Sequence, residues 1–194
     1  MNYLSRDERR EAILQAAMRV ALEEGFTAMT VRRIATEAGV ATGQVHHHFS
    51  SAGELKAQAF IRLIRTLLDA EPVPAGASWR ERLRAMLGSD EGSFEPYLRL
   101  WREAQILAWR DDEIKAAFLL TMEMWHLKTV AMINDGAAAQ EFILRDSAEN
   151  IAWRLIALVC GLDGMYLLTM PGMDNDAFYR HLDHQITLEL SDCS

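Results

Sequence analysis

The sequence predicts an all-α fold of about nine helices. Only four prolines occur in 194 residues, and Ala, Leu, Arg, Glu and Met, which favour helices, are abundant. Apolar residues recur at helical spacing, and no stretch sustains the apolar–polar alternation of a strand. Because half of the residues are apolar and a quarter are charged, we expect a globular chain with a sizeable core.

The N-terminal segment is predicted to form an amphipathic helix over residues 6–24. Ile13, Ala17 and Val20 share one face of it at helical spacing. Gly25 follows the last periodic residue, where a glycine commonly ends a helix.

Two short helices joined by a tight turn are predicted next. Thr30 is a good N-cap for the first, Gly39 suits the left-handed turn, and Thr42 is an N-cap candidate for the second. The apolar face of the first helix is formed by Val31, Ile34, Ala35 and Ala38. This arrangement can present the second helix to a DNA major groove about 12 Å wide.

A long helix over 51–69 is predicted to join this region to the rest of the chain, with Ser51 and Glu54 as a capping box. A break at Pro72, Pro74 and Gly76 follows. Further helices are expected at about 78–89, 94–110, 112–134, 146–169 and 174–190. We therefore expect a DNA-binding domain over 1–50, a connecting helix, and a second helical domain over 70–194.

Charge is unevenly distributed along the chain. Residues 1–65 carry nine Lys and Arg against seven Asp and Glu, whereas residues 66–194 carry eleven against twenty-one. The net charge is −8. This difference fits a small DNA-reading head on an acidic body.

Cysteine usage and hydropathy indicate a cytoplasmic protein. Cys160 and Cys193 match no metal or redox spacing, and Cys160 is expected to pack as a small apolar side chain. No signal-peptide core is expected at the N-terminus. The apolar stretch 151–170 contains Arg154 and Asp163, so we interpret it as a buried helix and expect no membrane partner.

The run at 30–49, Thr-Val-Arg-Arg-Ile-Ala-Thr-Glu-Ala-Gly-Val-Ala-Thr-Gly-Gln-Val-His-His-His-Phe, resembles the signature of TetR-family transcriptional regulators. The preceding amphipathic helix, the Gly25-Phe26 break and the downstream Glu54-Leu55 pair also match the family's spacing. The resemblance covers about the first 65 residues. It implies a homodimeric repressor that binds a palindromic operator and is released by a small-molecule effector, with no cofactor.

The resemblance also implies DNA contacts. Thr42, Gln44 and His47 are candidates for base contacts, and Thr30 and Arg33 for phosphate or base contacts. The full set of DNA-binding candidates is Thr30, Arg33, Thr42, Gly43, Gln44, His46, His47 and Lys56.

Two positions depart from the family pattern. His46 replaces a tyrosine that touches phosphate, and Ala52 replaces a lysine at the start of the fourth helix. Lys56, one turn later, is a substitute for that charge, and a backbone N–H at the helix start could also hold phosphate.

An effector pocket is expected where aromatic and Met residues gather. Trp101, Gln105 and Trp109 fall at i, i+4 and i+8 and would share a helix face. Such a set equally fits ordinary core, and both interpretations stay open. The candidates for an apolar or aromatic effector are Phe60, Ile64, Met86, Trp101, Gln105, Trp109, Met122, Trp125 and His126.

By resemblance, the last two helices form the dimer interface. Arg154 and Asp163 lie in an apolar helix, and each is expected to meet a group on the last helix or on a partner subunit. The interface candidates are Ala152, Ile156, Val159, Cys160, Asp163, Leu167, Phe178, Leu182 and Ile186.

Other classes of function find less support in the sequence. Adjacent histidines at 46–48 point in different directions on a helix, so a metal site there is disfavoured, and His181 and His184 are expected at the surface or an interface. No nucleophile elbow, phosphate loop or paired-carboxylate motif suggests an enzyme. The remaining alternative is a helical protein-interaction module of the same fold that has no specific DNA binding.

Overall fold

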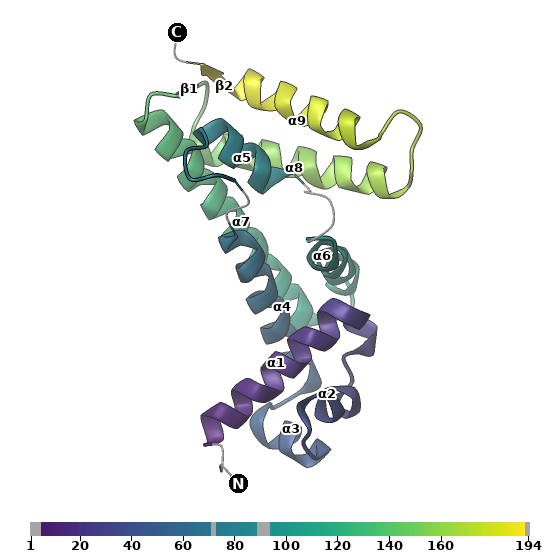
Figure 1. Ribbon diagram of the computed structural model, residues 1–194. Coiled ribbons are helices and arrows are strands. Elements are labelled where there is room, and N and C mark those ends of the chain that lie inside the picture. Colours follow the sequence, from purple (N-terminus) through teal and green to yellow (C-terminus); the bar gives the residue numbers. More distant parts are fainter. Residues whose placement is uncertain (1–4, 71–72, 89–93, 193–194) are drawn as a thin grey trace. The chain divides into compact units, whose positions relative to one another are not determined.

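The computed structural model describes residues 5–70, 73–88 and 94–192, so Pro72 and Cys193 lie outside the described part. Within it the chain forms nine α-helices, one 3-10 turn and two short strands (Figure 1). The all-α prediction is therefore confirmed. Contacts divide the chain into two compact units, residues 1–69 with 91–122, and residues 70–90 with 123–194.

The first unit contains the predicted helix-turn-helix. Its elements are α1 (Arg6–Glu24), the 3-10 turn η1 (Phe26–Ala28), α2 (Val31–Ala38), α3 (Thr42–His48), α4 (Ala52–Asp69), α6 (Glu95–Leu107) and the start of α7 (Asp112–Ala138). Residues 91–122 thus pack with the N-terminal region, although the sequence grouped them with 70–194. The functional boundary between the two domains stays a prediction.

Local signals explain where the first helices begin and end. Ser5 caps α1 through a reciprocal capping box with Glu8, and Gly25 ends it with φ at 82°. Thr30 accepts from the N–H of Arg33 to cap α2, and Gly39 ends α2 in the left-handed region at φ 65°. The predicted bounds of α1 and the roles of Thr30 and both glycines are confirmed.

The second unit contains a pair of strands that the sequence did not predict. Its elements are α5 (Trp79–Leu87), the part of α7 from residue 123 onward, β1 (Phe142–Leu144), α8 (Ala148–Leu167), α9 (Asn175–Glu189) and β2 (Leu190–Asp192). β1 and β2 pair antiparallel, with Ile143 opposite Ser191. Each strand has only three residues, too few for a period-two pattern to be visible.

Arg154 of α8 meets the last helix, as predicted. Its guanidinium donates to both carboxylate oxygens of Glu189 at 2.6 and 2.7 Å and to Asp146 at 2.9 Å. These carboxylates raise the pKa of Arg154, and Arg154 lowers the pKa of Glu189. The ion pair ties α8 to the end of α9, where β2 begins.

Among the described residues, α8 alone is long and apolar enough to cross a bilayer by length and composition. A core helix passes the same test, and the buried side chains of α8 include Ile151, Leu155 and Ile156. Helix α8 packs on α9 and α5, but only 33% of its apolar window is buried, so the prediction of a buried helix holds only in part.

Candidate nucleic-acid interface

The turn between α2 and α3 is built as the sequence predicts, but the second helix is capped differently. The N–H of Val40 donates to the carbonyl of Ala35 at 3.0 Å, which closes the turn around Gly39. The N-cap of α3 is Ala41 and not Thr42, because extended backbone continues through Ala41. Thr42 is the first helical residue, and its side chain makes no capping bond.

The predicted reading edge of α3 lies on the surface. Thr42, Gly43, His46 and His47 are exposed and Gln44 is half-buried, whereas Val45 on the opposite side is only 2% exposed. A hydroxyl, an amide and imidazoles along one helix edge can donate to and accept from base edges and phosphates. The structure therefore brings together the polar groups that a recognition helix needs.

Arg33 differs from its predicted role. Its guanidinium pairs with Glu24 at 2.7 Å and with Glu37 at 3.0 Å, and Glu37 also pairs with Arg19. The hydrogen bonds that Arg33 donates to Glu24 and Glu37 raise the pKa of Arg33. A phosphate contact would have to replace these partners, and the DNA contact of Arg33 stays a prediction. Thr30 is exposed, with its oxygen accepting the capping bond from the Arg33 N–H.

The start of α4 is also less suited to phosphate than expected. Ser51 donates its hydroxyl to Glu113 at 2.9 Å and accepts from the N–H of Glu54 at 2.8 Å. The Glu54 carboxylate accepts from Ser50 instead of closing the predicted box on Ser51. Two carboxylates thus occupy this helix start, so a backbone phosphate site there is disfavoured. Lys56 is half-buried on the next turn.

Sequence reasoning missed a group of positive charges beside α3. Arg10 of α1 lies 4.5 Å from the centre of the Phe49 ring and donates to Gln58 at 2.7 Å. Arg6, Arg9 and Arg10 all act electrostatically on His48. The tertiary contact between α1 and α3 brings these residues together across forty positions of sequence, and no local pattern signals it.

His48 sits in an environment that disfavours its charge. Its Nδ1 is buried and finds no hydrogen-bond partner among the described residues. Desolvation, and then the charges of His47, Arg6, Arg9 and Arg10, lower the pKa of His48 from its usual 6.5. Neutral His48 therefore fits this site and protonated His48 does not.

Acidification should destabilise the N-terminal unit through His48. As the pH falls through 6.5, the unfolded chain binds a proton before folded His48 does, so the stability of the fold decreases until the pH passes the lowered folded pKa. We expect the melting temperature to fall over this window and to fall less in His48→Asn, which has no such titration. His181→Asn is the control and should show the wild-type dependence of melting temperature on pH. If His48→Asn showed that same dependence, His48 would not be the source of the acid destabilisation.

The effector candidates divide between the two units, and each group is described by itself. In the first unit, Phe60 and Ile64 are buried, and half-buried Trp101 lies 6.2 Å from Phe60 and 4.9 Å from Phe118 between ring centroids. Gln105 is exposed and Met122 half-buried. The expectation of a shared face fails for Trp109, because α6 ends at Leu107 and Trp109 is 88% exposed.

In the second unit, Met86, Trp125 and His126 are half-buried. The His126 ring stacks on Trp153 with centroids 4.2 Å apart, and its Nε2 lies 3.0 Å from the carbonyl oxygen of Glu149. His126 therefore joins α7 to α8 within this unit.

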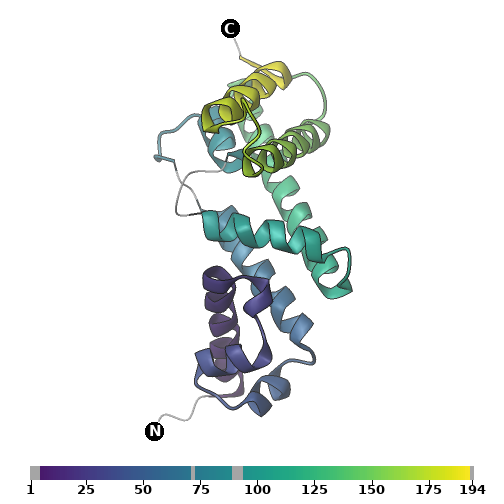
Figure 2. The same ribbon diagram turned by 90° about the vertical axis from the view of Figure 1, so that its right-hand side faces the viewer.

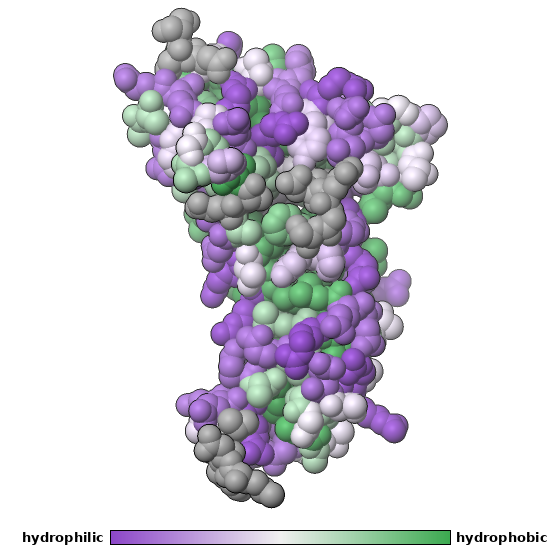
Figure 3. Space-filling model, in the orientation of Figure 1, coloured by the Kyte–Doolittle hydropathy of each residue, from purple (hydrophilic) through white to green (hydrophobic). Residues whose placement is uncertain are grey.

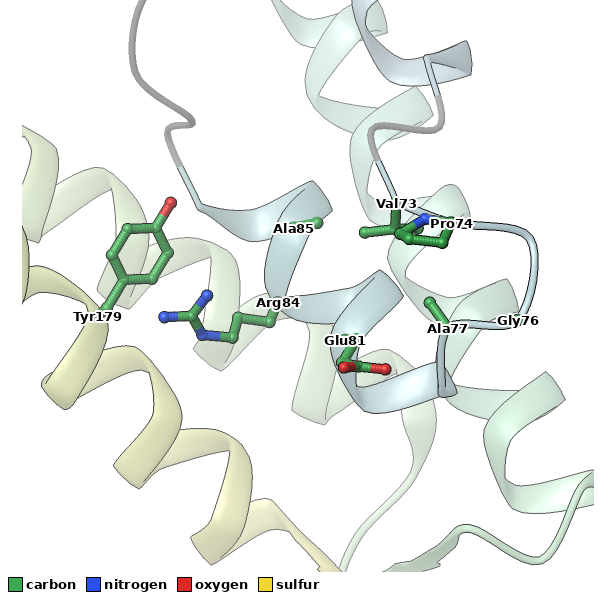
Figure 4. Close-up of a pocket in the computed structure, with 8 residues that line it drawn as sticks. All are labelled: Val73, Pro74, Gly76, Ala77, Glu81, Arg84, Ala85 and Tyr179. Carbon is green, nitrogen blue, oxygen red and sulfur yellow. The ribbon is translucent and has the colours of Figure 1, made fainter.

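An open hollow of about 470 Å³ lies in the second unit beside α5. Figure 4 shows the Arg84 guanidinium directed toward Tyr179, 4.0 Å from its ring centroid, and Arg84 also pairs with Asp183 at 2.8 Å. None of the predicted effector residues lines it. The lining residues are Val73, Pro74, Gly76, Ala77, Glu81, Arg84, Ala85 and Tyr179.

Most dimer-interface candidates face the wrong way for a second copy. Ala152, Ile156, Val159, Phe178, Leu182 and Ile186 are buried inside their own unit. Cys160 and Leu167 are exposed and Asp163 is half-buried, so the expectation that Cys160 packs inside is wrong. Both faces of α8 carry apolar residues, so the sequence pattern alone cannot distinguish the face that packs inside the unit from the face available to a second copy.

The outer surface of α8 and α9 is apolar as well. Figure 3 shows hydrophobic residues where α8 ends and the loop to α9 begins. We define the outer apolar surface by its exposed members, which are Trp153, Met165, Tyr166, Leu167, Leu168, Met170 and Leu188. Exposed large apolar residues gathered on one region of a folded chain are typical of an interaction surface.

Two short helices joined by a tight turn, the second with an exposed polar edge, in an otherwise helical chain define a helix-turn-helix DNA-binding regulator. Residues 13–58 match the model of the bacterial regulatory proteins of the tetR family. Over 172 residues the chain is 32% identical to the HTH-type transcriptional regulator BetI of Rhizobium meliloti (strain 1021), covering 82% of this chain and 76% of the relative. The chain belongs to the TetR family, a family of transcriptional regulators and not of enzymes.

Solved structures share the same fold. A TetR-family regulator from Rhodococcus sp. superposes with a TM-score of 0.78 at 24% identity, covering 95% of this chain and all of the other. A putative transcriptional regulator from Saccharomonospora viridis, solved in complex with choline, gives a TM-score of 0.73 at 23% identity over 95% of this chain and 98% of the other. The likeness confirms the predicted fold.

Proposed function

We propose that this regulator is a transcriptional repressor that binds a palindromic operator as a homodimer in the cytoplasm and is released by a small effector. The observation that carries the proposal is the polar edge formed by exposed Thr42, His46 and His47 with half-buried Gln44, fixed from behind by buried Val45. A helix held in this way can read base edges, while its flanking groups touch phosphates.

The outer apolar surface supports the homodimer. Its exposed side chains lie on the two helices that a symmetric pair would bring together, and a two-fold interface uses the same patch on both subunits. Two reading helices would then face the same side of a duplex about one helical turn, 34–36 Å, apart.

Selection of genomic fragments by the purified protein tests the DNA part of the proposal. We expect enrichment of sites with two-fold symmetry whose half-sites lie about 10 base pairs apart or a multiple of that spacing. Enrichment of no common sequence would support the alternative of a protein-interaction module. That alternative is favoured by one observation, the two carboxylates at the start of α4.

For the effector we propose a small quaternary ammonium compound, with choline as the probe. The likeness to the choline-bound regulator supports it. Residues 66–194 carry a large excess of acidic residues, which favours a cation, and aromatic rings such as Trp101 can bind a quaternary ammonium through their faces.

Choline titration into the protein–operator complex tests the effector. We expect choline, and not ethanolamine at the same concentration, to lower operator affinity in the wild type. Trp101→Leu should lose this response, whereas Trp109→Leu, at an 88% exposed position, should keep it. If choline released neither the wild type nor Trp109→Leu from the operator, while both bound DNA normally, choline would be removed from the proposal and the DNA part would stand.

A further inference from the structure

Helix α6 touches the end of α1 through two charged side chains that sequence reasoning did not single out. Arg99 donates from Nη2 to the carbonyl oxygen of Leu22 at 2.6 Å. One turn further along α6, the carboxylate of Glu103 accepts from the N–H of Phe26 at 2.7 Å. Figures 1 and 2 show α6 lying beyond the C-terminal end of α1, inside the same unit.

Each charge matches the helix end that it meets. Leu22 lies in the last turn of α1, where carbonyl groups have no partner within the helix and carry partial negative charge. Phe26 opens η1, where N–H groups carry partial positive charge. The cation of Arg99 therefore meets the negative end and the anion of Glu103 meets the positive end. We name this pair of contacts the α6 clamp.

Gly25 lies between the two points that the α6 clamp holds. Its φ of 82° suits glycine, and a Cβ at this position would come within 2.7 Å of the Glu103 carboxylate. The close approach of Glu103 to the backbone therefore depends on Gly25. The sequence indicated Gly25 only as a helix end, and the structure gives it this second role.

The clamped segment leads directly into the DNA-reading helices. Phe26 and Met29 are buried, and Thr30, the next residue, is the N-cap of α2. The Phe26 ring lies 5.6 Å from Phe60 of α4, which in turn lies 6.2 Å from Trp101 of α6. Helix α6 thus holds both the backbone before α2 and the core beneath it.

We propose that Arg99 and Glu103 are positioning residues for DNA binding, which fix the helix-turn-helix relative to α6 without touching DNA. The inference rests on the proposed operator binding and deepens it. Two recognition helices on one operator must be held at a fixed separation, and pre-organisation of each helix-turn-helix lowers the free-energy cost of that binding. A ligand that displaced α6 would act on the helix-turn-helix through the same two contacts.

The palindrome found by genomic selection and a duplex with only one half-site together test the α6 clamp. We expect Arg99→Ala and Glu103→Ala to weaken binding to the palindrome about 10- to 100-fold, comparable with the loss of one charge-assisted hydrogen bond. Binding to the single half-site should change less than about twofold, because the α2–α3 contacts are retained. Glu103→Gln, which keeps an acceptor for the Phe26 N–H, should recover most of the palindrome affinity.

Arg110→Ala and Glu123→Ala are the matched controls, since both are exposed and change the net charge equally. Amide exchange at Phe26 in the DNA-free protein gives a second readout, which should accelerate in Glu103→Ala and hardly change in Glu103→Gln. Melting temperatures must show that each variant is folded at the assay temperature.

Two results would overturn the α6 clamp while the proposed repressor stands. One is equal weakening on both duplexes, and the other is wild-type affinity for the palindrome in folded Arg99→Ala and Glu103→Ala. A wild type that selects no palindrome would instead contradict the proposed function, and with it the role of the α6 clamp in DNA binding.

Discussion

Phe60→Ala should lower the free energy of unfolding by about 3–5 kcal/mol, the usual cost of emptying a buried phenylalanine site. Phe60 is fully buried in α4, and its ring lies between Phe26 and Trp101. The change removes the contacts of this ring with η1 and α6, and the backbone around it can close only part of the cavity.

Urea unfolding of Phe60→Ala and wild type measures this loss. Trp109→Ala is the matched control, because it also removes a large aromatic side chain but at an 88% exposed position, and its effect should stay within about 0.5 kcal/mol. A similar small effect for Phe60→Ala would show that Phe60 is not part of the core of this unit.

Gln44→Ala and His47→Ala should each weaken operator binding about 5- to 150-fold, which corresponds to the 1–3 kcal/mol of one base contact. Both residues lie on the exposed edge of α3. If they contact bases, the loss should be confined to the cognate sequence, and discrimination at one base pair of each half-site should relax.

Lys56→Gln should behave differently, because a phosphate contact carries no sequence information. We expect weaker binding to all duplexes and a decrease of about 1 in the salt dependence of affinity. His181→Ala, on an exposed position of α9, is the control and should bind as wild type. Sequence-independent weakening by Gln44→Ala or His47→Ala would show that they contact the backbone and not the bases.

The helix-turn-helix could be predicted closely because its signals are local. The Thr30 cap and the left-handed Gly39 are each determined by the residue itself and its nearest neighbours. The one local error is the N-cap of α3. Thr42 has the better side chain for that role, but Ala41 occupies the position, because the turn after Gly39 leaves Ala41 extended and Thr42 already helical.

Contacts between distant residues could not be predicted in this way. The ion pairs of Arg33 are one example, because nothing in the sequence shows that Glu24 and Glu37 reach it. Arg99 and Glu103 resemble any solvent-exposed charges on α6 until the end of α1 is placed against them.

The interface candidates fall mostly on buried residues for a different reason. Helix α8 is apolar on more than one side, so periodicity alone cannot separate its inner residues, such as Ile156, from its outer ones, such as Met165. Only the packing of α9 shows which side is already used.

The most direct test of the central claim, that α3 reads DNA sequence, is a comparison of affinities at one salt concentration. The wild-type protein is titrated with the selected operator and with a duplex of the same composition in scrambled order. The account predicts a preference for the operator of about 1,000-fold or more, as specific regulators show. Equal affinity for the two duplexes would contradict it.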